Sequence, residues 1–199
     1  YYGSFEKLKK SFIKFIEKTP SFGKSLICID NNHLKSLLPK FKTRNFLTYG
    51  FDKHSNYQII NVKKKIDHSI FSLKINLSSN KTFTVKNIVV NLIGDHNITN
   101  ATASVAIALN LGIKINKVKK ALKEFLGIQR RFTKVFTISK REFYDDYAHH
   151  PTEIKAVINS ARQVYKKRKI ISVFQPHRYS RVKSLKNEFA SSFKSSDIV

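Results

Sequence analysis

Four clusters of polar and ionisable residues in this sequence have the types and spacing of a ligand-binding or catalytic site. The first follows the glycine at position 94 and contains the amides of Asn97 and Asn100. Side-chain amides offer both hydrogen-bond donors and acceptors, which suits recognition of a nucleobase edge. Asparagines are also common at helix starts, where they satisfy backbone N–H groups, so capping and ligand binding are both open for this pair.

The second cluster is the adjacent pair Arg130 and Arg131, which precedes Phe132. A guanidinium group is planar and forms two parallel hydrogen bonds to a phosphate. Arginines in a segment that links two domains are often simply exposed to solvent. A phosphate contact and a solvated linker are therefore the two interpretations of this pair.

The third and fourth clusters, residues 145–153 and 174–181, each follow an expected strand and precede an expected helix. The members that could act chemically are Asp146, Tyr147, His149, His150, His177, Arg178 and Arg181. In open α/β sheets, ligands bind at the carboxyl ends of the strands, and neighbouring strands would bring these side chains to one edge. A metal site is one interpretation of the histidines. The arginines disfavour a cation, so we favour an anion or carboxylate pocket.

Hydrophobic periodicity predicts an α/β chain around these clusters. Helices are expected at 5–16, 32–38, 101–111, 151–165 and 181–193, and between Asn116 and Gly127. Strands are expected at 25–29, 45–49, 132–138, 142–144, 169–174 and 196–199, with an antiparallel meander over 57–92 that turns at 78–81. The first strand, helix and strand predict a parallel βαβ unit. Because 128–132 lacks apolar periodicity, we expect two domains, 1–128 and 129–199.

Composition limits the class of protein. The 199 residues carry 38 Lys plus Arg against 13 Asp plus Glu, a formal charge of +25. A basic nucleic-acid-binding module is one interpretation of this charge, but 30 of these residues are Lys, spread along the chain, whereas base recognition favours gathered arginines. No apolar run approaches the roughly 20 residues that span a bilayer, so membrane insertion is not expected. Cys28 is the only cysteine, which fits a reducing compartment such as the cytoplasm.

Several common catalytic motifs are missing from the sequence. It contains neither a G-x-x-x-x-G-K-[ST] phosphate-binding loop nor a G-x-G-x-x-G dinucleotide fingerprint. It also has no recognisable Ser-His-Asp or Cys-His arrangement. From the residues alone, the chain is predicted to be an α/β ligand-binding protein whose chemistry is open.

In their order along the chain, the clusters resemble the Mur ligase family of peptidoglycan biosynthesis. The resemblance covers essentially the whole chain in eight segments, residues 2–6, 28–30, 37–39, 48–51, 96–101, 130–132, 145–153 and 174–181. It implies the later part of a P-loop-type central ATPase domain followed by the start of a Rossmann-like C-terminal domain. The P-loop, the magnesium ligands and a UDP-binding domain are then expected before Tyr1, with further strands after Val199. The chain alone is expected to be inactive.

The resemblance also implies a reaction. In it, ATP activates the carboxylate of UDP-N-acetylmuramate as an acyl phosphate, with Mg²⁺ as cofactor, and the amine of L-alanine then forms the amide bond. This carbon–nitrogen ligation belongs to cell-wall synthesis in the cytoplasm. The segment 175–181 resembles the L-alanine-adding members. A sister ligase that adds a preformed tripeptide during recycling is the close alternative.

The family's functional residues carry over to positions of this sequence. Asn97 and Asn100 are expected to contact adenine, and Asp146 to hold the ribose hydroxyls. Arg131 is expected to reach the phosphates, and it is an expected catalytic residue together with His149. The wall where amino acid and acyl group meet is expected to consist of Tyr147, His149, His177, Arg178 and Arg181. The resemblance assigns no metal ligand to this chain.

Overall fold

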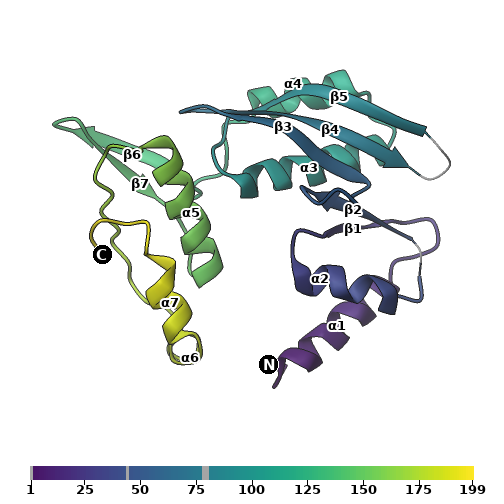
Figure 1. Ribbon diagram of the computed structural model, residues 1–199, viewed down its shortest axis with the longest axis horizontal. Helices are drawn as coiled ribbons and strands as arrows, with labels where there is room; N and C mark the ends of the chain where they lie inside the picture. The colour runs from purple at the N-terminus through teal and green to yellow at the C-terminus, as the bar shows by residue number, and fades with distance from the viewer. Residues whose placement is uncertain (1, 44, 78–80) are drawn as a thin grey trace. The chain divides into compact units, whose positions relative to one another are not determined.

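The computed structural model describes residues 2–43, 45–77 and 81–199, and its fold is mixed α/β as predicted (Figure 1). Contacts divide the chain into two compact units, which are described separately. The first comprises Tyr1–Val62, Ile70–Ile88 and Thr99–Lys120, and the second comprises Lys63–Ser69, Val89–Ile98 and Ala121–Val199. The domain boundary after residue 128 stays a prediction.

The N-terminal region forms the predicted parallel βαβ unit. Helix α1 (Phe5–Glu17) begins at Ser4, whose side chain accepts a hydrogen bond from the Lys7 N–H. Strands β1 (Ser25–Cys28) and β2 (Phe46–Gly50) pair in parallel. Helix α2 (Asn32–Leu37) and a short 3₁₀ helix, η1 (Leu38–Lys40), connect them. Their apolar core consists of Ile16, Ile27, Ile29, Leu37 and Phe41.

Three more strands extend this sheet to the order β1-β2-β3-β4-β5. They are β3 (Tyr57–Lys64), β4 (Ser69–Leu77) and β5 (Lys81–Val90). Hydrogen bonds run in antiparallel order between β3 and β4, from Lys65 to His68 and from Asn76 to Asn56. They do so again between β4 and β5, where Ser69 bonds to Leu92 and Thr82 to Asn76, so the predicted antiparallel meander is confirmed. The turn predicted at 78–81 involves 78–80, which lie outside the described residues. Phe71, Leu73 and Ile75 alternate along β4 and are fully buried.

Asn56 joins three strands where β2 passes into β3. Its Oδ1 accepts hydrogen bonds from the Thr48 N–H at 2.9 Å and the Thr48 hydroxyl at 3.0 Å. Its Nδ2 donates to the Asn76 carbonyl of β4 at 3.0 Å. Strands β2 and β3 are parallel and pair at Tyr49 and Gly50. The Asn56 side chain adds a link between β2 and β4 beside this short ladder.

We expect Asn56→Ala to lower the free energy of unfolding by about 1–3 kcal/mol, because partly buried donors and acceptors on Thr48 and Asn76 lose their partner. Asn56→Asp keeps the acceptor but not the donor, so its loss should be smaller than that of alanine. Urea unfolding followed by circular dichroism measures both. Equal stability of all three proteins would contradict this role of Asn56.

Two helices follow the sheet. Helix α3 (Asp95–Asn110) begins six residues before the predicted start at 101, so Asn97 and Asn100 lie within its first two turns. Near its end, Asn110 donates a hydrogen bond to the Tyr57 hydroxyl of β3 at 2.9 Å. Helix α4 (Ile115–Glu124) follows. No helix within the described residues is long and apolar enough to cross a membrane.

The C-terminal region has a two-stranded antiparallel sheet and three helices. The sheet pairs β6 (Thr133–Ile138) with β7 (Arg141–Asp145), and both predicted strands are confirmed. The helices are α5 (Pro151–Val164), α6 (Tyr179–Ser184) and α7 (Lys186–Ser192). The core that joins them consists of Ile154, Ile158 and Phe189, with Ala148, Phe174, Val182, Leu185 and Phe193 packed against it.

The prediction of a buried strand at 169–174 is wrong. This segment makes a single parallel bridge, between Ile171 and Ile198, and the strand predicted at 196–199 is reduced to the same bridge. Ile171 and Val173 are 60% and 97% exposed. A buried parallel strand needs partners on both edges and both faces. Here only Phe174 packs into the core.

The single helix predicted at 181–193 is also wrong, because Leu185 interrupts it. Leu185 has φ −124° and ψ 30°, outside the helical range, and separates α6 from α7. Its side chain packs against the core around Phe189. Helix periodicity continues across this residue in the sequence, so the pattern did not reveal the break.

Glu142 anchors a polar network between β6, β7 and the end of α5. Its carboxylate accepts a hydrogen bond from the Tyr144 hydroxyl at 2.9 Å and lies 3.3 Å from Lys134 Nζ and 3.4 Å from Arg168 Nη1. Hydrogen bonds from Tyr144 and Tyr165, assisted by Lys134, outweigh burial and lower the pKa of Glu142 from 4.5 to about 2. The carboxylate therefore stays ionised in the folded chain at pH values where an unfolded one is protonated.

A depressed folded-state pKa gives stability that is present above the unfolded value and lost as the pH falls through the folded one. For Glu142 this window runs from 4.5 to about 2. We expect the melting temperature of Glu142→Gln to fall less across this window than that of the unsubstituted chain. Thermal unfolding at a series of pH values measures the difference, and identical pH slopes would contradict it.

Candidate functional site

The loop between β7 and α5 holds the third sequence cluster in a fixed conformation. Asp146 accepts two backbone hydrogen bonds, from the Phe132 N–H to Oδ2 and from the Ala148 N–H to Oδ1, both at 2.7 Å. One side chain thereby ties the start of β6 to the loop after β7. These N–H groups are satisfied by the carboxylate in place of a strand or helix partner.

Arg130 and Arg131 differ in their surroundings. Arg130 Nε lies 3.2 Å from Asp145 Oδ2, and its guanidinium stacks 4.8 Å from the centre of the Tyr147 ring. The Arg130 carbonyl also accepts the Tyr147 N–H at 2.8 Å. Arg131 is exposed and stands between two residues with left-handed φ angles, 58° at Arg130 and 52° at Phe132. Such angles strain non-glycine residues and occur at functional sites.

The start of α5 is a capping box. His150 is the N-cap residue, and its Nδ1 accepts the Thr152 N–H at 3.3 Å. Glu153 Oε2 reaches back to the N–H groups of His149 at 3.1 Å and His150 at 3.2 Å. Burial opposes ionisation of Glu153, but these hydrogen bonds and the nearby His149 ring outweigh it and lower its pKa.

The His149 ring has a defined tautomer. Its Nδ1 lies 2.9 Å from the Tyr147 carbonyl oxygen, an acceptor only, so Nδ1 carries the proton and donates. The neutral ring then has its lone pair on Nε2. His150 has the opposite arrangement, because its Nδ1 accepts a hydrogen bond. Of the two adjacent histidines, His149 is the one whose Nε2 is able to accept a proton.

The fourth cluster meets the third through Arg181. Its Nη1 donates to the His149 carbonyl at 3.2 Å. His177 and Arg178 are exposed on the segment before α6, and Arg178 has a left-handed φ of 64°. The structure therefore brings Arg181, in the first turn of α6, to the backbone of His149, and Arg178 is the N-cap residue of the same helix.

The first cluster lies on the first two turns of α3. Asn97 Nδ2 donates to the Ile93 carbonyl at 2.8 Å, whereas a capping asparagine accepts from an N–H. Asn100 is exposed one turn further along the helix. His96 lies between Gly94 and Asn97 in the sequence. Its burial lowers its pKa, which favours the neutral form of the ring.

Within residues 2–43, 45–77 and 81–199, no three side chains of His, Cys, Asp or Glu gather closely enough to hold a metal ion.

Sequence reasoning gave no separate role to two residues of this site. Glu153 was noted only as the end of the third cluster, although a glutamate three residues after a helix start is the signal of a capping box. Arg130 was grouped with Arg131. Both arginines are exposed, and nothing in the sequence indicated that Arg130 is the one that contacts Asp145 and Tyr147.

Comparisons with known proteins place this chain in a family. Residues 1–108 match the family described as Mur ligase middle domain, and residues 130–199 match Mur ligase, glutamate ligase domain. The UDP-N-acetylmuramate--L-alanine ligase of Pelagibacter ubique is 53% identical over 199 residues, which are the whole of this chain and 43% of that protein.

Two solved structures show the same fold. The UDP-N-acetylmuramate-alanine ligase of Thermotoga maritima aligns with a TM-score of 0.73 and 25% identity, over 98% of this chain and 41% of that one. The MurF ligase of the same organism, in complex with ADP, gives a TM-score of 0.72 at 16% identity, over 100% of this chain and 44% of that one. The resemblance stated from the motifs is thus confirmed: the chain belongs to the Mur ligase family.

Proposed function

We propose that this chain is part of an ATP-dependent ligase that joins L-alanine to UDP-N-acetylmuramate in peptidoglycan biosynthesis. The observation that carries this proposal is the 53% identity, over every residue of the chain, with a ligase of that name. The chain spans less than half the length of that relative, so the reaction is proposed for the whole protein.

The proposed reaction places specific demands on the site. ATP converts the muramate carboxylate to an acyl phosphate, and the L-alanine amine attacks its carboxyl carbon. Negative charge develops on oxygen, so cations and fixed hydrogen-bond donors must surround the reacting atoms. The described residues supply cations and a proton acceptor around the loop at 146–150.

For the nucleotide, we assign Asn97 and Asn100 to adenine, Asp146 to the ribose and Arg131 to the phosphates. Each carboxylate oxygen of Asp146 accepts one backbone N–H and has a second lone pair for a ribose hydroxyl. Exposure and the strained backbone on either side support a ligand role for Arg131. The ADP complex of the MurF ligase supports nucleotide use.

For the acceptor, we assign the carboxylate of L-alanine to Arg178 and Arg181, three residues apart. Guanidinium groups pair with carboxylates in bidentate geometry. His149 would take the proton from the amine through Nε2, and we therefore assign it, with Arg131, as a catalytic residue. Tyr147 and His177 complete the wall of the pocket.

Magnesium would accompany ATP in this reaction, with ligands from outside the described residues. We place the reaction in the cytoplasm, because it consumes ATP.

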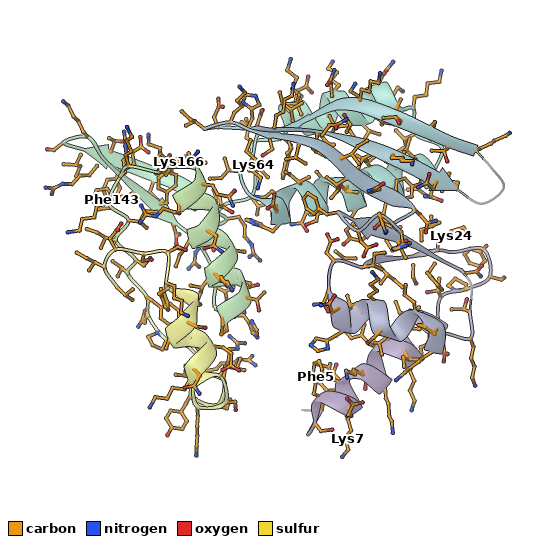
Figure 2. All side chains as sticks on the ribbon, viewed as in Figure 1. Phe5, Lys7, Lys24, Lys64, Phe143 and Lys166 are labelled. Atoms are coloured by element: carbon orange, nitrogen blue, oxygen red, sulfur yellow. The ribbon has the colours of Figure 1, made fainter. Side chains whose placement is uncertain are left out.

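The basic nucleic-acid-binding alternative finds little support in the distribution of charge. Lys7 lies on α1, Lys24 before β1, Lys64 at the end of β3 and Lys166 after α5 (Figure 2).

The test is a full-length chimera in which these 199 residues replace the matching 43% of the Pelagibacter ubique ligase. We expect it to release phosphate from ATP only when UDP-N-acetylmuramate and L-alanine are both present. Preference for a tripeptide acceptor would replace the proposal with the recycling ligase. Absence of both activities in a folded chimera would reject it.

In this chimera, Arg131→Lys should lower kcat at least about tenfold, about 1.4 kcal/mol of transition-state stabilisation, since lysine keeps the charge but loses the bidentate fork. Arg141→Lys, which alters an exposed arginine in β7, is the matched control. Steady-state kinetics measure both. Unchanged kcat in Arg131→Lys and Arg131→Ala would make Arg131 a solvated residue.

Substitutions in the fourth cluster should affect KM for L-alanine, and substitutions in the first cluster should affect KM for ATP. We expect Arg178→Ala or Arg181→Ala to raise KM for L-alanine at least about tenfold with little change for ATP, because a charge-assisted hydrogen bond is lost. Asn97→Ala or Asn100→Ala should raise KM for ATP instead. Parallel changes in both constants would argue against separate nucleotide and amino-acid sites.

A further inference from the structure

We propose that Glu153 is a positioning residue for catalysis, which holds His149 in the orientation and tautomer that let its Nε2 accept the proton of the attacking amine. This inference rests on the proposed function and adds to it a residue without an assigned role. Glu153 acts through His149 and contacts no substrate itself.

The first observation is that one carboxylate oxygen meets three groups. Glu153 Oε2 accepts the N–H of His149 at 3.1 Å and that of His150 at 3.2 Å, and it lies 3.6 Å from His149 Nδ1. An ordinary capping box needs only the N-cap N–H. The extra contacts, to the backbone and the ring of His149, go beyond what helix capping requires.

The second observation is the direction of the His149 ring. Nδ1 donates to the Tyr147 carbonyl at 2.9 Å, and the ring packs edge-on to the Tyr147 ring at 5.1 Å between centres. Arg181 holds the His149 carbonyl at 3.2 Å. Tyr147, Glu153 and Arg181 therefore restrain the residue at its ring, its N–H and its carbonyl.

The third observation is charge. Glu153 is ionised near neutral pH, since its pKa is lowered. A carboxylate close to Nδ1–H stabilises the imidazolium that forms when Nε2 takes a proton, the role that a carboxylate plays beside the histidine of a hydrolase triad. The positive charge of Arg181, which binds the His149 carbonyl, disfavours protonation of the His149 ring. The negative charge of Glu153 offsets this effect.

The step balances with groups already named. The amine nitrogen forms a bond to the carboxyl carbon, and the bond from that carbon to the phosphate oxygen breaks. The electron pair of that bond leaves with phosphate. The nitrogen gives one proton to His149 Nε2, which later passes it to phosphate or solvent.

The competing explanation is that Glu153 only caps α5. His150 provides the matched control, because its Nδ1 forms the other half of the capping box through the Thr152 N–H, whereas the contacts of Glu153 to His149 do not involve the His150 side chain. His150→Ala therefore weakens the helix start and spares the contacts of Glu153 to His149. A purely structural role predicts the same kinetic effect for both substitutions.

The experiment uses the full-length chimera with Glu153→Gln, Glu153→Ala and His150→Ala, each compared by melting temperature and steady-state kinetics. We expect Glu153→Ala to lower kcat at least about tenfold with KM for ATP within about twofold, a loss confined to the reacting step. Glu153→Gln keeps an acceptor oxygen without the charge, so its kcat should lie between those of alanine and wild type. His150→Ala should lower the melting temperature while keeping kcat within about threefold.

Two results would overturn the inference. One is a kcat of Glu153→Gln equal to wild type. The other is an equal loss of kcat in Glu153→Ala and His150→Ala, which would reduce Glu153 to a capping residue. If Glu153→Ala does not fold, Glu153→Gln decides alone: a reduced kcat supports the inference and an unchanged kcat overturns it. Inactivity of the unsubstituted chimera toward L-alanine is a different result, because it rejects the proposed function itself.

Discussion

The loop between β7 and α5 depends on two carboxylates that satisfy backbone N–H groups. Residues 146–150 belong to no strand or helix, so their donors lack the partners that regular structure provides. Asp146 binds the N–H groups of Phe132 and Ala148, and Glu153 binds those of His149 and His150. Charged acceptors make stronger hydrogen bonds than neutral ones, which gives an irregular segment a fixed conformation.

This constraint separates fixed from exposed functional groups. His149 and Arg181 are tied to the loop, whereas Arg131, His177 and Arg178 are exposed. Preorganised groups lower the barrier because they need not be ordered during the reaction. Arg131 follows a residue with a left-handed φ angle, Arg130, and Arg178 has such an angle itself. Strained backbone of this kind occurs at functional sites, which fits binding of charged substrates by these two exposed arginines. We therefore expect His149, which is fixed, to act on the proton. Arg131 and Arg178, which are exposed, are expected to bind phosphate and carboxylate, the latter together with the fixed Arg181.

Sequence reasoning predicted the elements whose pattern is local. The βαβ unit, the meander and α5 follow from period, caps and turn residues, as Ser4 illustrates. It failed where tertiary context decides: 169–174 has an apolar strand pattern but lacks partners, and Leu185 breaks a helix in order to pack on Phe189. At the site, the motifs named candidate residues whose roles stay predictions, but a motif cannot say which nitrogen of His149 donates or that Arg130 is the arginine beside Asp145.

The central claim is that this loop holds His149 with its proton on Nδ1 and its lone pair on Nε2. Nitrogen-15 NMR of the histidine rings measures this directly, because protonated and unprotonated ring nitrogens have well-separated chemical shifts. In the full-length chimera, with His149 assigned by comparison with His149→Gln, we expect a protonated Nδ1 on the neutral ring of His149 and a protonated Nε2 on that of His150. A protonated Nε2 on neutral His149, or rapid exchange between the two tautomers, would contradict it.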